Sequence, residues 1–417
     1  MGSILTEDTK TILLLCGVFG EDRTVKVLSA AEYSALARWL MESGMRPCDL
    51  LRSEHVAAAA NGSGLAQERL EYLLGRGIEL GFAVEEWERS GIWIVSRSDS
   101  DYPQRCKQHL KDVTPPLFFC AGDRQLMQRR GIAIVGSRNV DGEGEEFTRQ
   151  TASFCAANHI AVISGGARGV DQLAMNSALE SGGMVIAVLA DSLLKKSVER
   201  HARYALADGR LLLMSPYNPT SPFSVGNAMG RNKLIYAMSD YGLVVHSDYK
   251  KGGTWSGAEE ELKRKEARPV FVHMAENSPQ GNKELLGIGA LPWPDDINQD
   301  NIKERLAGLL KQHRKKREQH SVQLSFTLPS SSSDKKKEPE AEVQQLAPCS
   351  LYSVVLPVIL KYLQQPVELD KLAVMLDVQK SQLNLWLKRA VEEGRVIRLM
   401  RPVRYQRCLD MTDGAVH

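Results

Sequence analysis

The stretch GIAIVGSR at residues 131–138 decides the fold class of this chain of 417 residues, because a short apolar run ends there in glycine, a hydroxyl residue and arginine. The same arrangement returns at 160–171, where IAVI leads into SGGARGVD. Further short β-branched runs alternate with helix-like stretches up to residue 273. Such alternation predicts an α/β fold, a Rossmann-like parallel sheet covered by helices on both faces.

The alternation gives the expected elements of this core. The expected strands are Ile132–Gly136, Ile160–Ser164, Met184–Ala190, Leu211–Met214, Leu243–His246 and Val270–His273. The expected helices are Gly144–Asn158, Asp171–Ser181, Val198–Ala207, Gly226–Ser239 and Gly257–Ala267. Residues 96–128 are expected to form a connector with strand and turn character.

Four parts are expected along the chain. Residues 1–95 form an N-terminal helical module, in which Ser29 and Glu32 are spaced as a capping box. The core follows at 96–300. A basic helix and a polar, disordered linker occupy 301–347, since the serine- and lysine-rich stretch 321–347 has no means of burying a core.

The C-terminal part, 348–410, is expected to be a winged-helix domain. Apolar periodicity predicts helices at 351–363, 367–376 and 380–392, and a small hairpin around Arg401 and Pro402 would form the wing. Winged helices bind DNA or dock other proteins, and the sequence leaves both roles open.

Composition narrows the functional class. The formal net charge is only +2, so a nucleic-acid surface has to be a local patch. The seven cysteines form no CxxC pair, which argues against a disulfide framework and a zinc site. The longest apolar runs are far shorter than a membrane span, and no secretion signal is evident. We therefore expect a cytoplasmic protein with no metal, no cofactor and no membrane association.

Two glycine-arginine loops carry the first chemical signal. In the first, Gly136 allows close approach of a backbone, and Ser137 and Arg138 can bond a phosphate. The loop is not the GxGxxG fingerprint, so a standard dinucleotide site is not supported. In the second, Arg168 accompanies glycines that free backbone N–H groups to face an anion at a helix N-terminus, while Asp171 fits a capping role. Those glycines are Gly165, Gly166 and Gly169.

Two further motifs add cations. Arg231, Asn232 and Lys233 are expected early in the helix Gly226–Ser239, where positive charge opposes the helix dipole unless an anion is bound. The loop KKGGTWSGA at 250–258 offers Lys250, Lys251, Gly253 and Thr254 to phosphates, and Trp255 either stacks on a base or packs in the core. A series of cations with little acid among them suits several phosphates in a row.

These motifs resemble the DprA/Smf family of DNA-processing proteins, from about Ser96 to Val272. The matching motifs are DYP (101–103), PPLFFCAG (115–122), AIVGSR (133–138), SGGARGVD (164–171), GMVIAVLA (183–190), GRNKLI (230–235) and the GGT loop (252–254). The chain departs from the family at Met175, where the family usually has His, and at 228–230, where Ala-Met-Gly replaces a segment with Phe-Pro. The resemblance is therefore to a divergent member.

The resemblance implies binding of single-stranded DNA, dimerisation and transfer of the strand to a RecA-type recombinase in natural transformation. Carried over by position, it implies DNA contacts at Ser137, Arg138, Ser164, Gly165, Arg168, Gly169, Arg231, Asn232 and Lys233. Together with the loops above, the predicted DNA- or phosphate-binding set is Gly136, Ser137, Arg138, Ser164, Gly165, Gly166, Arg168, Gly169, Arg231, Asn232, Lys233, Lys250, Lys251, Gly253 and Thr254.

No catalytic constellation is found, which favours a binding protein over an enzyme. There is no HExxH motif, no evident Ser-His-Asp set and no acidic cluster for two metal ions. The alternative is a nucleotide sensor or a nucleotide phosphoribohydrolase of the LOG type, whose GGxGTxxE loop is partly matched at 252–259 with Glu259 as the acid. A scaffold that has lost its ligand is a third interpretation.

Overall fold

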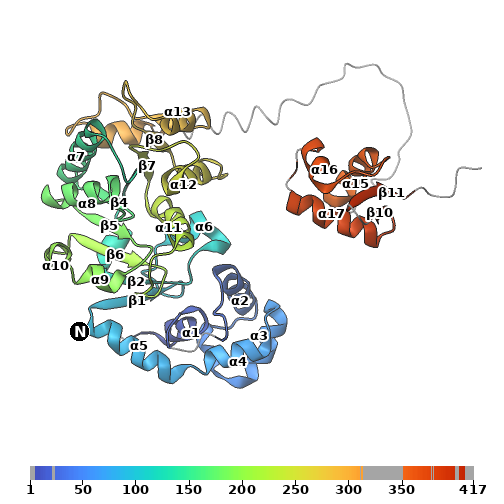
Figure 1. The fold of residues 1–417 in the computed structure, drawn as a ribbon. Helices are drawn as coiled ribbons and strands as arrows, with labels where there is room; N and C mark the ends of the chain where they lie inside the picture. The colour runs from blue at the N-terminus through green and yellow to red at the C-terminus, as the bar shows by residue number, and fades with distance from the viewer. Residues whose placement is uncertain are drawn as a thin grey trace, which may run out of the picture. The chain divides into compact units, whose positions relative to one another are not determined.

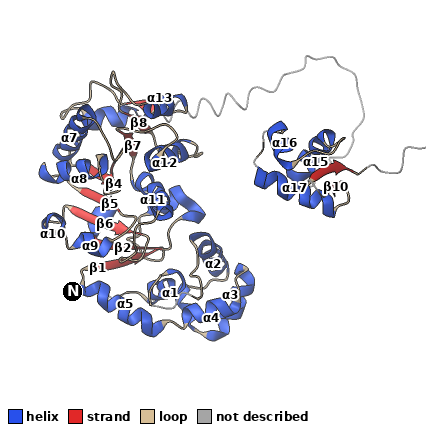
Figure 2. Ribbon diagram, in the orientation of Figure 1, coloured by secondary structure: helices blue, strands red, loops and turns tan. Residues whose placement is uncertain are grey.

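The structure is a computed structural model that describes residues 5–20, 24–309, 311–312, 351–376, 378, 380–399 and 403–408 (Figures 1 and 2). The chain divides into two compact units, Met1–Leu328 and Pro329–His417, which we describe separately. The predicted linker 321–347 and the predicted turn at Arg401 and Pro402 lie outside the described residues. No helix among those described is long and apolar enough to cross a membrane.

The first unit begins with a set of short helices. They are α1 (Glu7–Cys16), α2 (Ala30–Glu42), α3 (Ser53–Ser63), α4 (Gln67–Leu74) and α5 (Gly77–Arg89). The predicted capping box at the start of α2 is present: Glu32 N–H donates to Ser29 Oγ and Ser29 N–H donates to the Glu32 carboxylate. Trp87 of α5 packs edge-on against Phe119 with ring centroids 4.8 Å apart, so the helices share a hydrophobic core with the sheet.

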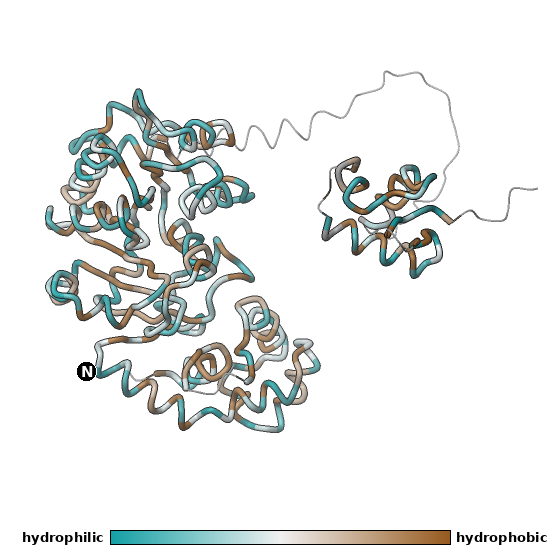
Figure 3. The backbone as a smooth tube through the Cα atoms, viewed as in Figure 1, coloured by the Kyte–Doolittle hydropathy of each residue, from teal (hydrophilic) through white to brown (hydrophobic). Residues whose placement is uncertain are grey.

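A nine-stranded sheet forms the centre of this unit, in the order β1-β2-β6-β5-β4-β3-β7-β8-β9. All six predicted strands are present, as β3 (Gly131–Val135), β4 (Ala161–Ser164), β5 (Val185–Val188), β6 (Leu211–Ser215), β7 (Tyr241–Val244) and β8 (Val270–Val272). They pair in parallel, as does the two-residue β9 (Leu291–Pro292). Figure 3 shows the apolar residues concentrated along these strands.

The sheet is not wholly parallel, because the region 96–128, where the sequence predicts strand and turn character, adds an antiparallel strand to it. That region holds α6 (Gln104–Leu110) and β2 (Leu117–Gly122), and β2 pairs antiparallel with both β1 (Ile92–Ser96) and β6. Phe118 and Phe119 are both buried, in the cores on opposite faces of the sheet. Antiparallel neighbours need no crossover helix, so the strand–helix alternation did not reveal them.

Helices cover both faces of the sheet (Figure 2). They include α7 (Gly142–Ala157), α8 (Val170–Glu180), α9 (Leu193–Ser197), α10 (Arg200–Ala207), α11 (Val225–Met238), α12 (Gly252–Leu262) and α13 (Gln280–Gly287). The predicted helices agree with these in place, but α12 starts at Gly252 rather than at the predicted Gly257. Much of the predicted loop 250–258 is therefore the first turns of a helix.

The strand order contains a reversal at β3. From β3 the sheet extends through β4, β5 and β6 on one side and through β7, β8 and β9 on the other. Because parallel strands end at the same edge, the loops that follow β3 and β7 separate in opposite directions and leave a crevice between them. In open α/β sheets such a switch point is where ligands bind.

The second unit is small. It consists of α15 (Leu351–Tyr362), α16 (Leu369–Met375), α17 (Lys380–Glu392) and an antiparallel hairpin of β10 (Val396–Leu399) and β11 (Arg404–Arg407). Its core gathers buried residues from all three helices and the hairpin, among them Ile359, Leu372, Leu387 and Tyr405. The element order is the one predicted, and the winged-helix assignment remains a prediction.

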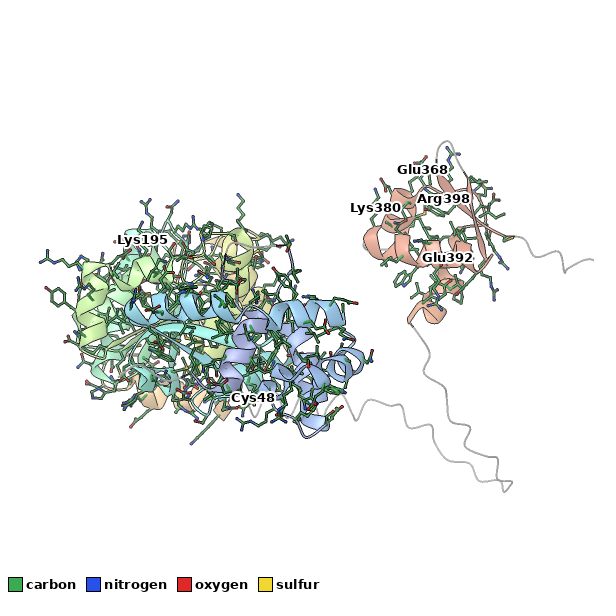
Figure 4. All side chains as sticks on the ribbon, turned by 90° about the horizontal axis from the view of Figure 1, so that it is seen from below. Cys48, Lys195, Glu368, Lys380, Glu392 and Arg398 are labelled. Carbon is green, nitrogen blue, oxygen red and sulfur yellow. The ribbon has the colours of Figure 1, made fainter. Side chains whose placement is uncertain are left out.

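Charged side chains cover the surface of the second unit, where Figure 4 labels Glu368, Lys380 and Arg398. Two cations of the third helix are paired within the unit: Lys380 with Asp370 at 2.5 Å and Arg389 with Glu393 at 2.9 Å. These two cations are therefore already neutralised by carboxylates of the same unit.

Candidate nucleic-acid interface

A cavity of about 580 Å³ lies at the switch point. Its walls are the loop 136–139 after β3, residues of α11 and the segment 248–257 that follows β7 and opens α12. Eight of the predicted binding residues line it, namely Gly136, Ser137, Arg138, Arg231, Asn232, Lys251, Gly253 and Thr254. Ala167 and Asp171 of the second motif also line it, so the structure brings together residues from all four motifs.

The first glycine-arginine loop opens into the cavity. Ser137 N–H donates to the carbonyl of His246 at 2.8 Å, which fixes the loop against the end of β7, and the Ser137 hydroxyl accepts from Asn139 N–H at 3.3 Å. Arg138 is exposed, and its guanidinium lies 5.8 Å from the ring centroid of Phe223. A Cβ at Gly136 would come within 2.5 Å of the Val170 side chain, so this position requires glycine. The loop therefore presents an exposed cation at the cavity.

The second loop is closed on itself. Asp171, which is 5% exposed, accepts a 3.4 Å hydrogen bond from Ala167 N–H, and the N–H groups of Gly136 and Gly165 also stabilise its charge. Burial raises the pKa of this carboxyl above its usual value, against the lowering effect of Arg231 and of these amides. The amides expected to hold a ligand phosphate instead face a carboxylate of the chain itself.

Arg231 completes this closed arrangement. It is 6% exposed, and its Nη1 lies 3.8 Å from Asp171 Oδ2 and donates to the carbonyl of Val188 at 3.2 Å. Its guanidinium lies against Gly165, where any Cβ would overlap it. Burial lowers the pKa of Arg231, and the Asp171 charge opposes that effect.

The rest of the third motif ties α11 to α12. Asn232 Nδ2 donates to Gly253 O at 3.0 Å, and Lys233 pairs with Glu260 at 3.0 Å. Since α11 begins at Val225, these residues lie in its second and third turns and not at its start, as the sequence had suggested. The prediction that their positive charges oppose the helix dipole at the start of the helix is therefore wrong.

The fourth motif contributes Lys251, which is exposed and lines the cavity. Lys250 lies outside the lining, with its ammonium 4.9 Å from the Tyr249 ring centroid. Trp255 is 4% exposed and packs edge-on against Tyr249 at 5.0 Å, so it is a core residue and offers no stacking face. Of the aromatic side chains that line the cavity, Phe223 is 53% exposed, whereas Tyr236 is buried; sequence reasoning missed Phe223, which stands in the proline- and serine-rich segment 219–224.

The remaining predicted residues, Ser164, Gly166, Arg168 and Gly169, do not line the cavity. Ser164 is fully buried, and its hydroxyl donates to the carbonyl of Ile134 at 2.7 Å, so its side chain serves the sheet and cannot reach a ligand. Gly166 and Gly169 have φ values of 65° and 89°, and a Cβ at Gly169 would overlap the carbonyls of Ser137 and Arg138. Arg168 is exposed, beside the cavity lining rather than in it.

Glu259 is not placed as a catalytic acid. It lies well inside α12 rather than in the first turn, and its carboxylate pairs with Lys263 at 2.9 Å. That hydrogen bond lowers the pKa of Glu259, and the residue does not line the cavity. Within the described ranges, no group of three or more His, Cys, Asp or Glu residues could hold a metal ion.

Comparisons with known proteins agree with this architecture. The family model of DNA recombination-mediator protein A matches residues 93–302, half of the chain. Protein Smf of Escherichia coli is 32% identical over 140 residues, which cover 33% of this chain and 37% of that protein. DNA processing protein DprA of Streptococcus pneumoniae is 28% identical over 161 residues, 38% of this chain and 55% of that protein.

The chain spans between 37% and 62% of the length of the curated relatives that it matches. Among solved structures, DNA processing protein A (DprA) from Streptococcus pneumoniae aligns with a TM-score of 0.57 at 21% identity, covering 73% of this chain and 99% of that one. At that identity the likeness concerns the fold. With the matching motifs and the matched residues 93–302, it confirms the resemblance seen in the sequence: the chain belongs to the DNA recombination-mediator protein A family, the DprA/Smf family.

Proposed function

We propose that this protein binds single-stranded DNA in the switch-point cavity and does not cut it. The observation that carries the proposal is the composition of the cavity rim, where Arg138 and Lys251 come from loops after two different strands and Phe223 offers an open aromatic face. Cations and an exposed aromatic ring are the two features that hold a single strand without reading its sequence. The names of the relatives, which describe DNA processing, support the same proposal.

The charges that line the cavity set the expected strength of binding. Arg138, Arg231 and Lys251 face Asp171 and Asp248. Because Arg231 and Asp171 neutralise each other, Arg138 and Lys251 are the lining cations open to phosphates. We define the salt slope as the slope of log affinity against log salt; two phosphates on a single strand give a slope of about −1.4.

Phe223 supplies the preference for a single strand. Its ring is half exposed at the rim, beside Arg138, and a base that stacks on it has to leave its own stack. Stacking of a base on an aromatic side chain is worth about 1–3 kcal/mol. A duplex cannot present a base in this way without unpairing, so its bases gain nothing from Phe223.

Further parts of the proposal follow from the resemblance. We propose that the protein is a homodimer in the cytoplasm, that it transfers the strand to a RecA-type recombinase, and that the second unit is a winged helix which binds DNA or another protein. The domain limits of 1–95, 96–300, 301–347 and 348–410 are proposed on the same basis. We also propose that five other predicted residues of the cavity lining contact the DNA strand through backbone, hydroxyl or amide groups. They are Gly136, Ser137, Asn232, Gly253 and Thr254.

The proposal is tested by fluorescence anisotropy with a labelled single strand, a duplex and free nucleotides, each at several salt concentrations. We expect the single strand to bind most tightly, with little dependence on sequence and with a linear salt dependence. Equal binding of duplex, or affinity that does not change with salt, would refute it.

A non-enzymatic role is supported by the surroundings of Glu259. A phosphoribohydrolase needs its carboxylate beside the bound nucleotide, whereas Glu259 is bonded to Lys263 away from the cavity lining. We expect no release of free base from nucleoside monophosphates by the wild-type chain. A release activity that Glu259→Gln abolishes would support the hydrolase instead.

A further inference from the structure

We infer that Asp171 and Arg231 form a buried ion pair which positions the two glycine loops, and that Arg231 does not contact the phosphates of the ligand. The inference rests on the proposed function, since it concerns the same cavity. It assigns Arg231, which the family resemblance places among the DNA contacts, the role of a positioning residue.

Burial is the first observation. The side chains of Arg231 and Asp171 are 7% and 8% exposed, and the guanidinium sits over Gly165 between the ends of β4 and β5. Its Nη1 is engaged by Asp171 and by the Val188 carbonyl, and its Nε is buried without a partner among the described residues. Arg231 lines the cavity, but Nη1 of its guanidinium is already held by the chain itself, in the space over Gly165.

The second observation is that an anion already occupies the amide cradle. The N–H groups of Ala167, Gly165 and Gly136, from both glycine loops, stabilise the Asp171 carboxylate. Such converging amides form the usual binding place for a phosphate. A phosphate in this cradle would meet a carboxylate at close range in a poorly screened environment, where like charges repel strongly. Ligand phosphates are therefore directed to the outer rim, to Arg138 and Lys251.

The third observation is that the pair joins the parts of the site. Asp171 belongs to the first turn of α8, Arg231 to the middle of α11, and Val170 N–H donates to the carbonyl of Ser137 at 3.3 Å. Gly169 packs directly on the first loop, where a Cβ would overlap the backbone of Ser137 and Arg138. Loss of the pair therefore moves the second loop and, through Gly169, the loop that carries Arg138.

Two roles for Arg231 predict opposite effects of the same substitutions. If Arg231 is a positioning residue, either Asp171→Asn or Arg231→Gln leaves one buried charge without its partner and disturbs both loops. If Arg231 is a phosphate ligand, Asp171→Asn removes a competing negative charge and strengthens DNA binding.

The test is a double-mutant cycle in the full chain, with Asp171→Asn, Arg231→Gln and both together, measured by single-strand anisotropy across several salt concentrations. We expect each single variant to bind about tenfold more weakly at every salt concentration with the salt slope unchanged, and the double variant to bind more tightly than either. Lys251→Gln is the matched control for a phosphate ligand, and it should lower the magnitude of the salt slope by about 0.7. Tighter binding by Asp171→Asn, or a salt slope lowered by Arg231→Gln as in the control, would overturn the inference.

The inference remains testable where DNA binding or folding fails. If wild type binds no single strand, the proposed function fails, but the ion pair can still be measured by unfolding the same variants in denaturant. Non-additive changes in the unfolding midpoint support the ion pair, and additive changes overturn it. If the single variants do not fold, Arg231→Lys and Asp171→Glu, which keep the charges, take their place. These two keep both charges, so they are compared by their unfolding midpoints: non-additive changes in the pair of variants support the ion pair, and additive changes overturn it.

Discussion

The two glycine-arginine loops look alike in sequence and differ in what they do with their charges. The loop after β3 holds Arg138 exposed at a cavity of about 580 Å³. The loop after β4 turns its amides toward Asp171, which Arg231 covers from α11. One loop is open to a ligand and the other is filled by the chain itself. The comparison shows that a glycine-rich loop is an anion site only if no residue of the protein already occupies it.

The largest effect is expected where the closed loop cannot accept a side chain. In Gly165→Ala, the added Cβ overlaps the guanidinium of Arg231 and crowds Asp171, so the buried pair has to move. We expect a loss of about 3 kcal/mol in the free energy of unfolding, from overpacking and from the displaced charge. Denaturant unfolding measures it.

The control for this prediction is Gly142→Ala, at the first residue of α7, where a Cβ meets nothing within 4 Å. The control should change stability by no more than about 1 kcal/mol. Similar stabilities for the two variants would mean that the second loop is not closed as described.

The next effect concerns the open loop. Arg138→Gln should weaken single-strand binding by about 1–3 kcal/mol, which is the scale of a lost charge-assisted contact. The exposed guanidinium makes no ion pair with the described residues, so it is available to a phosphate. Anisotropy at several salt concentrations should also show the magnitude of the salt slope lowered by about 0.7. Arg203→Gln is the control, because Arg203 is exposed on α10 and lines a different groove. An equal loss in both variants would indicate a general charge effect rather than a site.

A smaller effect is expected for the arginine of the closed loop. Arg168 is exposed but lies outside the cavity lining, so Arg168→Gln should cost about 0.5 kcal/mol of binding, as for a screened contact at the edge of a site. The same anisotropy series measures this change. If Arg168→Gln costs as much as Arg138→Gln, the two loops are equivalent and the contrast between them is wrong.

The smallest effect is a pH dependence of stability that comes from Asp171. Burial raises its pKa in the folded state above the usual 3.8, so the folded protein binds this proton more tightly than the unfolded chain. The contribution of Asp171 to stability therefore falls as pH rises through the raised pKa and is recovered as pH falls through it. Unfolding curves of wild type and Asp171→Asn at a series of acidic pH values should show wild type gaining relative to the variant as pH is lowered. The opposite trend would mean that the pKa is depressed.

Local pattern was enough to predict much of the fold. Six parallel strands and the helices between them follow from short β-branched runs that alternate with amphipathic stretches, and the switch point places the ligand site beside Gly136. The sequence did not predict β1 or the antiparallel pairing of β2 with the sheet, because an antiparallel edge leaves no alternating signature.

The site was predicted less completely than the fold, because its decisive contacts are long-range. Arg231 meets Asp171 from another helix, and no local pattern in either segment records that contact. The sequence left Trp255 open between stacking and core packing, and the structure buries it in α12, which begins at Gly252. Phe223, for which the sequence predicted no role, stays at the rim. Residue type indicated the chemistry of the site, and tertiary packing determined which residues are free to perform it.

Hydrogen–deuterium exchange with and without a saturating single strand tests the central claim most directly, that the ligand lies against the open loop. We expect slower exchange at 137–139 and 251–254, which line the cavity, and unchanged exchange at Gly165 and Ala167, whose N–H groups already face Asp171. Protection at Gly165 and Ala167 with none at 137–139 would contradict the claim.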